Sequence, residues 1–173
     1  IHGAILGRRN NSDHKKEMEK HNITGIDLLI INLYKFKETI EKTKDDFKII
    51  ENIDVGGPTM VRAGAKNYEF VSVITDIKDY PELLNQLKNN GSTTFEFRKF
   101  LAAKAFKLTS DYDKAISEWF NKDKDNDFEL PDIISLELQK ILPMRYGENP
   151  HQNAAFYKTA DKRIGVAQSK KLQ

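Results

Sequence analysis

Two short apolar runs, each followed by a helical pattern, constrain the fold of this chain more than any other feature. The first run, Leu28 to Leu33, is apolar apart from Asn32, and the second, Phe70 to Thr75, is rich in β-branched residues. The first run does not alternate polar and apolar residues, so we expect a strand buried on both faces of a parallel sheet. Helical patterns at residues 36–44 and 80–91 follow the two runs. This alternation predicts an α/β layered fold with a parallel sheet.

A long amphipathic segment comes next. Thr93, with Glu96 three residues later, fits a capping box that begins a helix. Apolar residues then recur at spacings of three and four, at Phe97, Leu101, Ala105, Leu108, Tyr112, Ile116 and Trp119 or Phe120. This stripe predicts a packing helix, in the core or at an interface between copies, with Trp119 as a core residue rather than a stacking platform.

Charge and composition argue against several classes of protein. The 28 Lys and Arg residues nearly balance 26 Asp and Glu residues, for a net charge of +2, which does not support a nucleic-acid surface. The chain has no cysteine, so disulfides and thiolate metal sites are excluded, and its histidines lack metal-ligand spacing. No apolar run approaches the roughly 20 residues of a membrane helix. We expect a cytoplasmic protein that binds neither nucleic acid nor membrane and holds no metal.

A polar stretch, NKDKDNDFELPD, marks a boundary after the long helix. The partly alternating ISLELQKILPMRY that follows predicts a strand entering a second unit. We therefore divide the chain into a first domain at residues 1–120, a linker at 121–142 and the start of a second domain at 143–173. The chain begins with Ile1 rather than methionine and stops without a terminating signal, so we expect part of a longer protein.

The stretch IDVGGPTMVRAGAKN carries the first group of candidate site residues. Pro58 suits the first position of a helix, and Gly56 and Gly57 let the backbone approach a ligand closely. The N–H groups and positive dipole end of a helix start attract anions. An ordinary turn into a helix has the same composition, so both interpretations remain open.

Charged residues flank this helix start. Asp54 precedes the turn, where its carboxylate can accept a proton or cap the helix, and Arg62 and Lys66 share a helix face. Asn32 and Tyr34 lie at the carboxyl end of the first strand, where ligands collect in open α/β sheets. Tyr34 also fits a core position, whereas Asn32 fits one less well because a buried amide needs several partners.

A second candidate stretch, PMRYGENPHQ, lies beyond the linker. It combines Arg145, Tyr146 and His151 with a glycine and a proline, in a pattern too irregular for a helix or strand. Such loops often bind ligands, although a solvated connection has the same composition.

Five stretches together resemble one family. IHGAILGRR, INLYKF, IDVGGPTMVRAGAKN, TSDYDKAISEWF and RYGENPHQ, in this order, are similar to the bifunctional enzyme of the last two steps of purine nucleotide synthesis. That enzyme joins 5-aminoimidazole-4-carboxamide ribonucleotide (AICAR) transformylase and inosine monophosphate (IMP) cyclohydrolase in one chain. The resemblance implies a methylglyoxal-synthase-like α/β fold for the first domain, incomplete here, and the start of a second α/β domain.

The resemblance also implies site residues. Tyr34, Asp54 and Lys66 match the cyclohydrolase residues, while Ile31, Asn32, Asp54 and Val55 match the nucleotide pocket. Our hypothesis is that Asp54 orients or deprotonates the attacking nitrogen, Lys66 supplies a proton and Tyr34 positions the base. Arg145 and Tyr146 match the residues that bind AICAR in the transformylase.

Cofactors and partners follow from the same resemblance. Ring closure requires no cofactor, whereas the transformylase uses 10-formyltetrahydrofolate, and the family forms homodimers. Two positions depart from the family: Lys35 replaces a proline, which loosens the turn behind Tyr34, and Gly64 replaces an alanine, at about 1 kcal/mol of helix propensity. The alternatives are a module that binds a phosphorylated ligand without turnover, or a piece that is inert by itself.

Overall fold

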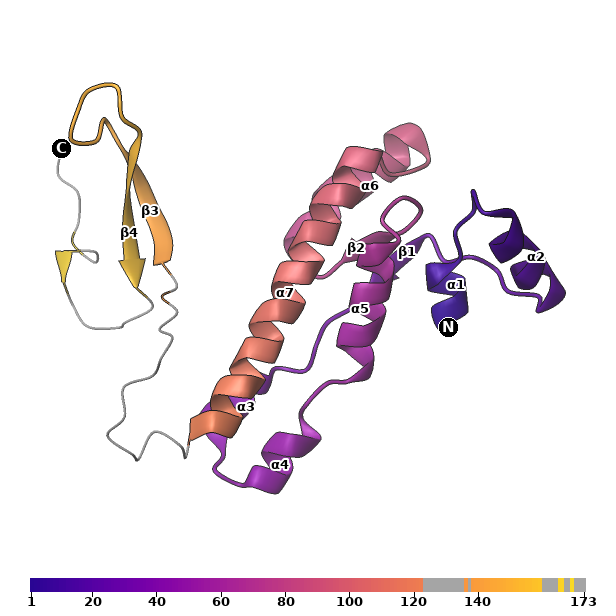
Figure 1. Ribbon diagram of the computed structural model, residues 1–173, viewed down its shortest axis with the longest axis horizontal. Coiled ribbons are helices and arrows are strands. Elements are labelled where there is room, and N and C mark those ends of the chain that lie inside the picture. The colour runs from indigo at the N-terminus through magenta and orange to yellow at the C-terminus, as the bar shows by residue number, and fades with distance from the viewer. Residues whose placement is uncertain (123–135, 137, 160–164, 167–168, 170–173) are drawn as a thin grey trace. The chain divides into compact units, whose positions relative to one another are not determined.

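The computed structural model describes residues 1–122, 136, 138–159, 165–166 and 169 (Figure 1). The chain divides into two units, Ile1–Asn126 and Asp127–Gln173. Most of the predicted linker, residues 123–135 and 137, lies outside the described residues.

The first unit alternates helices and strands, as expected for an α/β fold. Its elements are α1 (His2–Leu6), α2 (Ser12–Lys20), β1 (Leu28–Ile30), α3 (Phe36–Lys42), α4 (Asp46–Glu51), α5 (Gly56–Lys66), β2 (Ser72–Ile74), the 3-10 turn η1 (Ile77–Asp79), α6 (Tyr80–Asn90) and α7 (Phe95–Asn121). β1 and β2 pair in parallel, with Leu29 opposite Val73. The predicted fold class is therefore confirmed.

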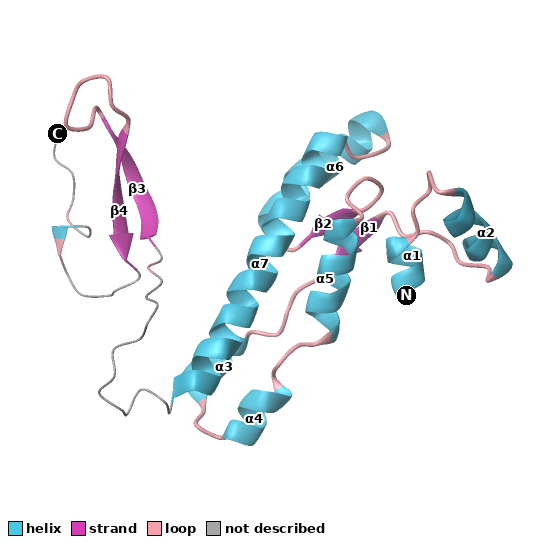
Figure 2. Cartoon of the chain, in the orientation of Figure 1, coloured by secondary structure: helices cyan, strands magenta, loops and turns pink. Residues whose placement is uncertain are grey.

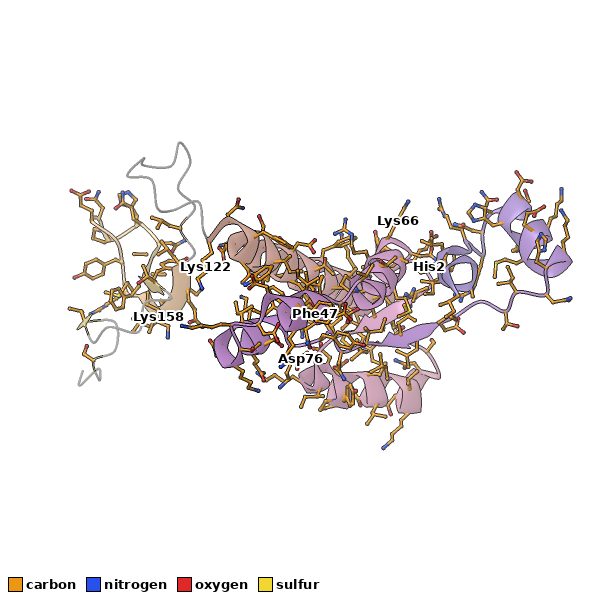
Figure 3. All side chains as sticks on the ribbon, turned by 90° about the horizontal axis from the view of Figure 1, so that it is seen from below. His2, Phe47, Lys66, Asp76, Lys122 and Lys158 are labelled. Carbon is orange, nitrogen blue, oxygen red and sulfur yellow. The ribbon has the colours of Figure 1, made fainter. Side chains whose placement is uncertain are left out.

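Helices cover both faces of this small sheet (Figure 3). On one face, α5 and α7 lie side by side, and Leu29 packs with Val61 of α5 and Ala105 of α7 (Figure 1). On the other face, Ile74 packs with Leu83 of α6.

The prediction that the first strand is buried on both faces is wrong. Only Leu29 of β1 is buried, whereas Leu28 and Ile30 are 36% and 50% exposed. Within the described residues β1 has β2 as its one neighbouring strand, and the α6 cluster packs against β2 rather than β1. Successive side chains of a strand point to opposite faces, so β1 buries only its α5 face.

The helix α7 is the packing helix that its apolar stripe predicts. Its N-terminal part packs with Ile74 and Leu83, and its C-terminal part with Phe36 and Ile49. Trp119 meets the Phe36 ring edge-to-face at 6.2 Å, which confirms its core role.

The helix starts differ from expectation at two places. The N-cap of α7 is Thr94, whose hydroxyl accepts from Phe97 N–H at 3.3 Å, so the predicted capping box at Thr93 is wrong. The Thr93 hydroxyl instead shares a 2.8 Å hydrogen bond with Ser72. Helix α5 begins at Gly56, two residues before Pro58, with Val55 at the N-cap position, and the Asp54 carboxylate accepts from Gly57 N–H in its first turn.

The buried Asn67 and the partly buried Arg9 anchor the start of the chain. Asn67 donates through its amide to the carbonyls of Ile5 (2.7 Å) and Gly7 (3.3 Å). Arg9 donates to the carbonyls of Phe70 (2.9 Å) and Ile26 (3.0 Å). The family-like IHGAILGRR stretch and Asn67 thus serve the fold.

The second unit contains an antiparallel pair, β3 (Leu138–Met144) and β4 (Ala154–Thr159), with a register shift between Lys140 and Leu142 (Figure 2). The predicted strand entering this unit is confirmed.

Candidate functional site

The candidate site lies beyond the carboxyl ends of the two parallel strands. After β1 the chain continues the pairing for one residue, with Ile31 N–H donating to Ile74 C=O at 3.0 Å, and then leaves the sheet. A hollow of about 620 Å³ opens here, lined by Asn32, Leu33, Tyr34, Lys35, Phe36, Lys37, Glu38, Thr75, Leu108, Asp111, Tyr112 and Ala115. This position is the usual one for ligands in parallel α/β sheets.

Asp54 connects the strand end to the start of α5. One carboxylate oxygen accepts from Gly57 N–H at 2.7 Å, and the other accepts from Tyr34 N–H at 3.2 Å. These two hydrogen bonds fix the position of the carboxylate between the strand end and the helix start. Of the two roles open from the sequence, capping is therefore observed. Each oxygen has a second lone pair, so the carboxylate also retains acceptor capacity.

The two glycines at the start of α5 have different surroundings. A Cβ on Gly57 would lie 2.6 Å from Asp54 Oδ2 and 2.7 Å from Leu33 Cδ2, whereas a Cβ on Gly56 would meet nothing within 4 Å. Gly57 is therefore required for the Asp54 cap, and Gly56 leaves open space at the helix start.

Tyr112 of α7 forms hydrogen bonds with the backbone around Asp54. Its hydroxyl accepts from Asp54 N–H at 2.8 Å and donates to Asn52 C=O at 3.3 Å. The ring is 8% exposed and lies edge-to-face with Phe36 at 6.2 Å. Burial raises the pKa of Tyr112. The sequence placed Tyr112 on the apolar stripe and in the family-like TSDYDKAISEWF stretch, but gave it no role at the site. The available signal was a hydroxyl on that stripe, since a buried tyrosine needs a hydrogen-bond partner.

Most of the other predicted pocket residues have exposed side chains. Tyr34 is 59% exposed and Val55 is 74% exposed, and Asn32 is exposed as well. Ile31 is half-buried and packs against the core. The core alternative for Tyr34 and Asn32 is therefore wrong, and both side chains are free to meet a ligand.

Lys35, which departs from the family pattern, makes a local ion pair. Its ammonium lies 2.8 Å from Glu38 Oε1. Hydrogen bonding to Glu38 raises the pKa of Lys35, and the same contact lowers the pKa of Glu38. The pair closes the first turn of α3, directly after Tyr34.

Lys66 is not part of this cluster within one chain. Lys66 is the last residue of α5, and Asp54 lies two residues before the first residue of that helix. The length of the helix, about 15 Å, therefore separates the two residues. Its side chain is exposed and points outward (Figure 3). Arg62, one turn earlier, lies over the Phe106 ring at 5.6 Å. Lys66 thus lies at the opposite end of α5 from Asp54, whereas Arg62 lies within the helix.

Arg145 and Tyr146 lie in the second unit, directly after β3, and both are exposed. Gln152 organises their loop: its carbonyl accepts from Gly147 N–H at 2.9 Å, and its side-chain oxygen accepts from Asn149 N–H at 2.9 Å. This hydrogen-bonded loop holds the backbone beside Arg145, a role for Gln152 that sequence analysis did not identify.

Metal and membrane features can be assessed for the described part of the chain. There, no three His, Asp or Glu side chains gather closely enough to hold a metal ion. No helix in the same part is both long and apolar enough to span a bilayer.

Parallel strands that end at a hollow, beside a helix start bonded by a carboxylate, define an α/β protein whose strand ends have the arrangement at which ligands commonly bind in such folds. The chain belongs to the AICARFT/IMPCHase bienzyme family, whose family model matches residues 64–173. This finding confirms the resemblance drawn from the sequence.

Curated relatives agree along the whole chain. The chain is 49% identical to the "Bifunctional purine biosynthesis protein PurH" of Bartonella bacilliformis, with all of this chain aligned to 32% of that protein. It is 46% identical to the protein of the same name from a Thermoanaerobacter species, with 99% of this chain aligned to 34% of that protein. The chain therefore spans about a third of the length of these relatives.

A solved structure shares the fold. The crystal structure of ForH superposes with a TM-score of 0.62 at 33% identity, over 70% of this chain and 63% of that one. The α/β architecture over the superposed part of the chain is thus shared with that structure.

Proposed function

We propose that the protein containing this chain closes the purine ring of formyl-AICAR to give IMP, with loss of water, and also transfers a formyl group to AICAR. In this proposal residues 1–120 are part of the cyclohydrolase domain, 121–142 the linker region, whose last residues belong to β3, and 143–173 the start of the transformylase domain. Membership of the bienzyme family supports the reaction class. The observation that carries the site assignment is the Asp54 carboxylate, held by Gly57 and Tyr34 N–H groups beside the hollow.

Ring closure joins the carboxamide nitrogen to the formyl carbon. The nitrogen is a weak nucleophile and must lose a proton as it attacks, while negative charge develops on the formyl oxygen. Asp54 accepts a hydrogen bond from the carboxamide N–H and takes the proton through its remaining lone pairs. Its two backbone hydrogen bonds keep the carboxylate oriented, so little reorganisation accompanies the reaction.

Neighbouring residues bind the nucleotide. Tyr34 and Asn32 present exposed polar side chains at the strand end, and Val55 presents an exposed apolar one. Ile31 lies beneath them and supports the wall of the hollow. The open space at Gly56, together with the Gly57 turn, lets backbone approach the ligand.

Lys66 remains a proposed proton donor, but its distance from Asp54 of the same chain sets a further condition. Because α5 separates Lys66 from Asp54 by about 15 Å, it would act on a substrate bound elsewhere than at the Asp54 of its own chain. A homodimer, which we propose for the intact protein, offers such a site in the second copy.

In the second unit, Arg145 and Tyr146 are proposed to bind AICAR for formyl transfer from 10-formyltetrahydrofolate. An exposed guanidinium presents several N–H donors to a ribonucleotide phosphate or carboxamide. The ring-closure step needs neither a metal nor an organic cofactor in this mechanism. A cytoplasmic location, without nucleic-acid or membrane partners, completes the proposal.

The test is a ring-closure assay on the intact protein. Replacing Asp54 with asparagine keeps the shape of the side chain but removes its charge and basicity, so kcat should fall by about 100-fold. Asp13→Asn, a change on the exposed first turn of α2, is the matched control and should leave kcat unchanged. Near-normal turnover by Asp54→Asn would contradict the assignment.

A second function, ligand binding without turnover, is favoured by one observation: both Asp54 oxygens already accept backbone hydrogen bonds, one from Gly57 at the helix start and one from Tyr34. Calorimetric titration of IMP into the intact protein distinguishes ligand binding without turnover from ring closure. Binding that survives in both Asp54→Asn and Lys66→Ala, in a protein that turns nothing over, would favour this alternative. Assaying the 173-residue chain alone tests whether the piece is inert by itself.

A further inference from the structure

The Asn52–Asp54 turn before α5 is held by one side chain from a distant part of the sequence. Tyr112 lies 58 positions beyond Asp54, on α7, and its hydroxyl bonds to the backbone at both ends of this turn. The remaining contacts of Asp54, to Gly57 and Tyr34, come from backbone of adjoining segments. Tyr112 is therefore the one side chain that fixes the Asp54 backbone among the hydrogen bonds of the described residues.

The hydrogen bonds of the Tyr112 hydroxyl assign it a supporting role. A phenol has one proton to donate, and Tyr112 donates it to Asn52 C=O while accepting from Asp54 N–H. The hydroxyl is thus engaged in both directions. Because burial raises the pKa of Tyr112, the group stays protonated at neutral pH and keeps its donor.

The ring of Tyr112 supports the other wall of the site. It packs edge-to-face with Phe36, which follows Tyr34 by two residues, and both rings line the hollow together with Tyr34. One residue of α7 therefore connects the strand-end loop to the turn that carries Asp54.

We propose that Tyr112 is a positioning residue for ring closure, which orients the Asp54 carboxylate by holding the Asn52–Asp54 turn. This inference rests on the proposed function of Asp54. A displacement of about 1 Å in a reacting group can cost up to 100-fold in rate, so a single supporting hydrogen bond has a measurable effect on turnover.

The first experiment compares Tyr112→Phe with wild type in ring-closure assays of the intact protein. Phenylalanine keeps the ring and its contact with Phe36 but removes both hydrogen bonds. We expect kcat to fall about tenfold while KM changes less than about twofold, because orientation rather than binding is lost. The control is Tyr68→Phe, which removes a hydroxyl without a hydrogen bond in the described part of the structure and keeps the ring contact with Phe95.

A double variant shows whether Tyr112 acts through Asp54. If it does, adding Tyr112→Phe to Asp54→Asn lowers kcat no further than Asp54→Asn alone. A full additional tenfold loss would overturn the proposal, because Tyr112 would then act independently of Asp54. An unchanged kcat in Tyr112→Phe alone would overturn it as well.

Hydrogen exchange supplies a readout that does not depend on activity. Mass spectrometry of peptides spanning residues 50–58 should show exchange at least about fivefold faster in Tyr112→Phe than in Tyr68→Phe, since the Asp54 amide loses its acceptor. Equal exchange in the two variants would overturn the positioning role. By contrast, wild-type turnover in Asp54→Asn would overturn the underlying function of Asp54, so the two failures are distinguishable.

Discussion

At the scale of single residues, the site depends on how closely backbone and carboxylate approach each other at the start of α5. The sequence predicted Gly56 and Gly57 as an equivalent pair, but their environments differ. A side chain on Gly57 would collide with Asp54 and Leu33, and one on Gly56 would extend into open space. Gly57 therefore leaves room for the Asp54 carboxylate, and Gly56 leaves open space at the start of α5.

Alanine substitutions test this difference. Gly57→Ala should lower the free energy of unfolding by about 1–3 kcal/mol and reduce ring closure, because the added methyl group displaces the Asp54 carboxylate. Gly56→Ala should leave the free energy of unfolding within about 1 kcal/mol of wild type, since nothing opposes the methyl group. Chemical denaturation of both variants measures the difference. Equal destabilisation would contradict the geometry.

The raised pKa of Tyr112 predicts a dependence of stability on alkaline pH. The folded state holds the phenol proton more tightly than the unfolded state, so this contribution is complete below the ordinary tyrosine pKa of about 10. It is lost as the pH rises through the higher pKa of the folded state. Above about pH 10, the free energy of unfolding of wild type should therefore fall more steeply with pH than that of Tyr112→Phe. Parallel curves would show that Tyr112 has the same pKa in both states.

At the scale of elements, α7 organises the first unit because its apolar stripe contacts three clusters in turn. The sequence predicted the stripe and a helical pattern at residues 80–91, and α6 ends at Gly91, whose φ of 66° suits glycine. It misplaced the beginning of α7 by one residue, because Thr93 and Thr94 carry the same hydroxyl. In the structure the Thr93 hydroxyl is bonded to Ser72, and Thr94 accepts from the helix.

The observed cap gives a prediction for α7. Thr94→Ala removes the acceptor for Phe97 N–H and should lower the free energy of unfolding by about 1 kcal/mol. Ser110→Ala, at an exposed position within the same helix, is the control and should be neutral or slightly stabilising. Urea unfolding measures the free energy of unfolding of both variants. Two equal midpoints would exclude Thr94 as the cap.

At the scale of the whole molecule, the separation of Lys66 from Asp54 sets a condition on the catalytic hypothesis. Within one chain the two groups stand at opposite ends of α5. If both serve ring closure in a homodimer, a site combines Asp54 of one copy with Lys66 of the other.

Mixing two inactive variants tests this arrangement. Intact Lys66→Ala and Asp54→Asn proteins, unfolded and refolded together, should recover about a quarter of wild-type activity, because half of the dimers are mixed and each carries one complete site. Each variant refolded alone is the control. Absence of recovery would mean that the two residues do not share a site between copies, and near-normal activity of Lys66→Ala would remove the lysine from the reaction.

The sequence by itself determined the α/β class, the two strands, most helix positions and the family. These features depend on local propensity and apolar periodicity, or on motifs spread along the whole chain. Tertiary structure alone decided which candidates meet: Asp54 joins Tyr34 across 20 positions and Tyr112 across 58, while Lys66, only 12 positions from Asp54, stands apart. The exposure of Leu28 and Ile30 was decided in the same way. Hydrogen-bond partners and burial depend on how separate elements pack, and local sequence does not encode that packing.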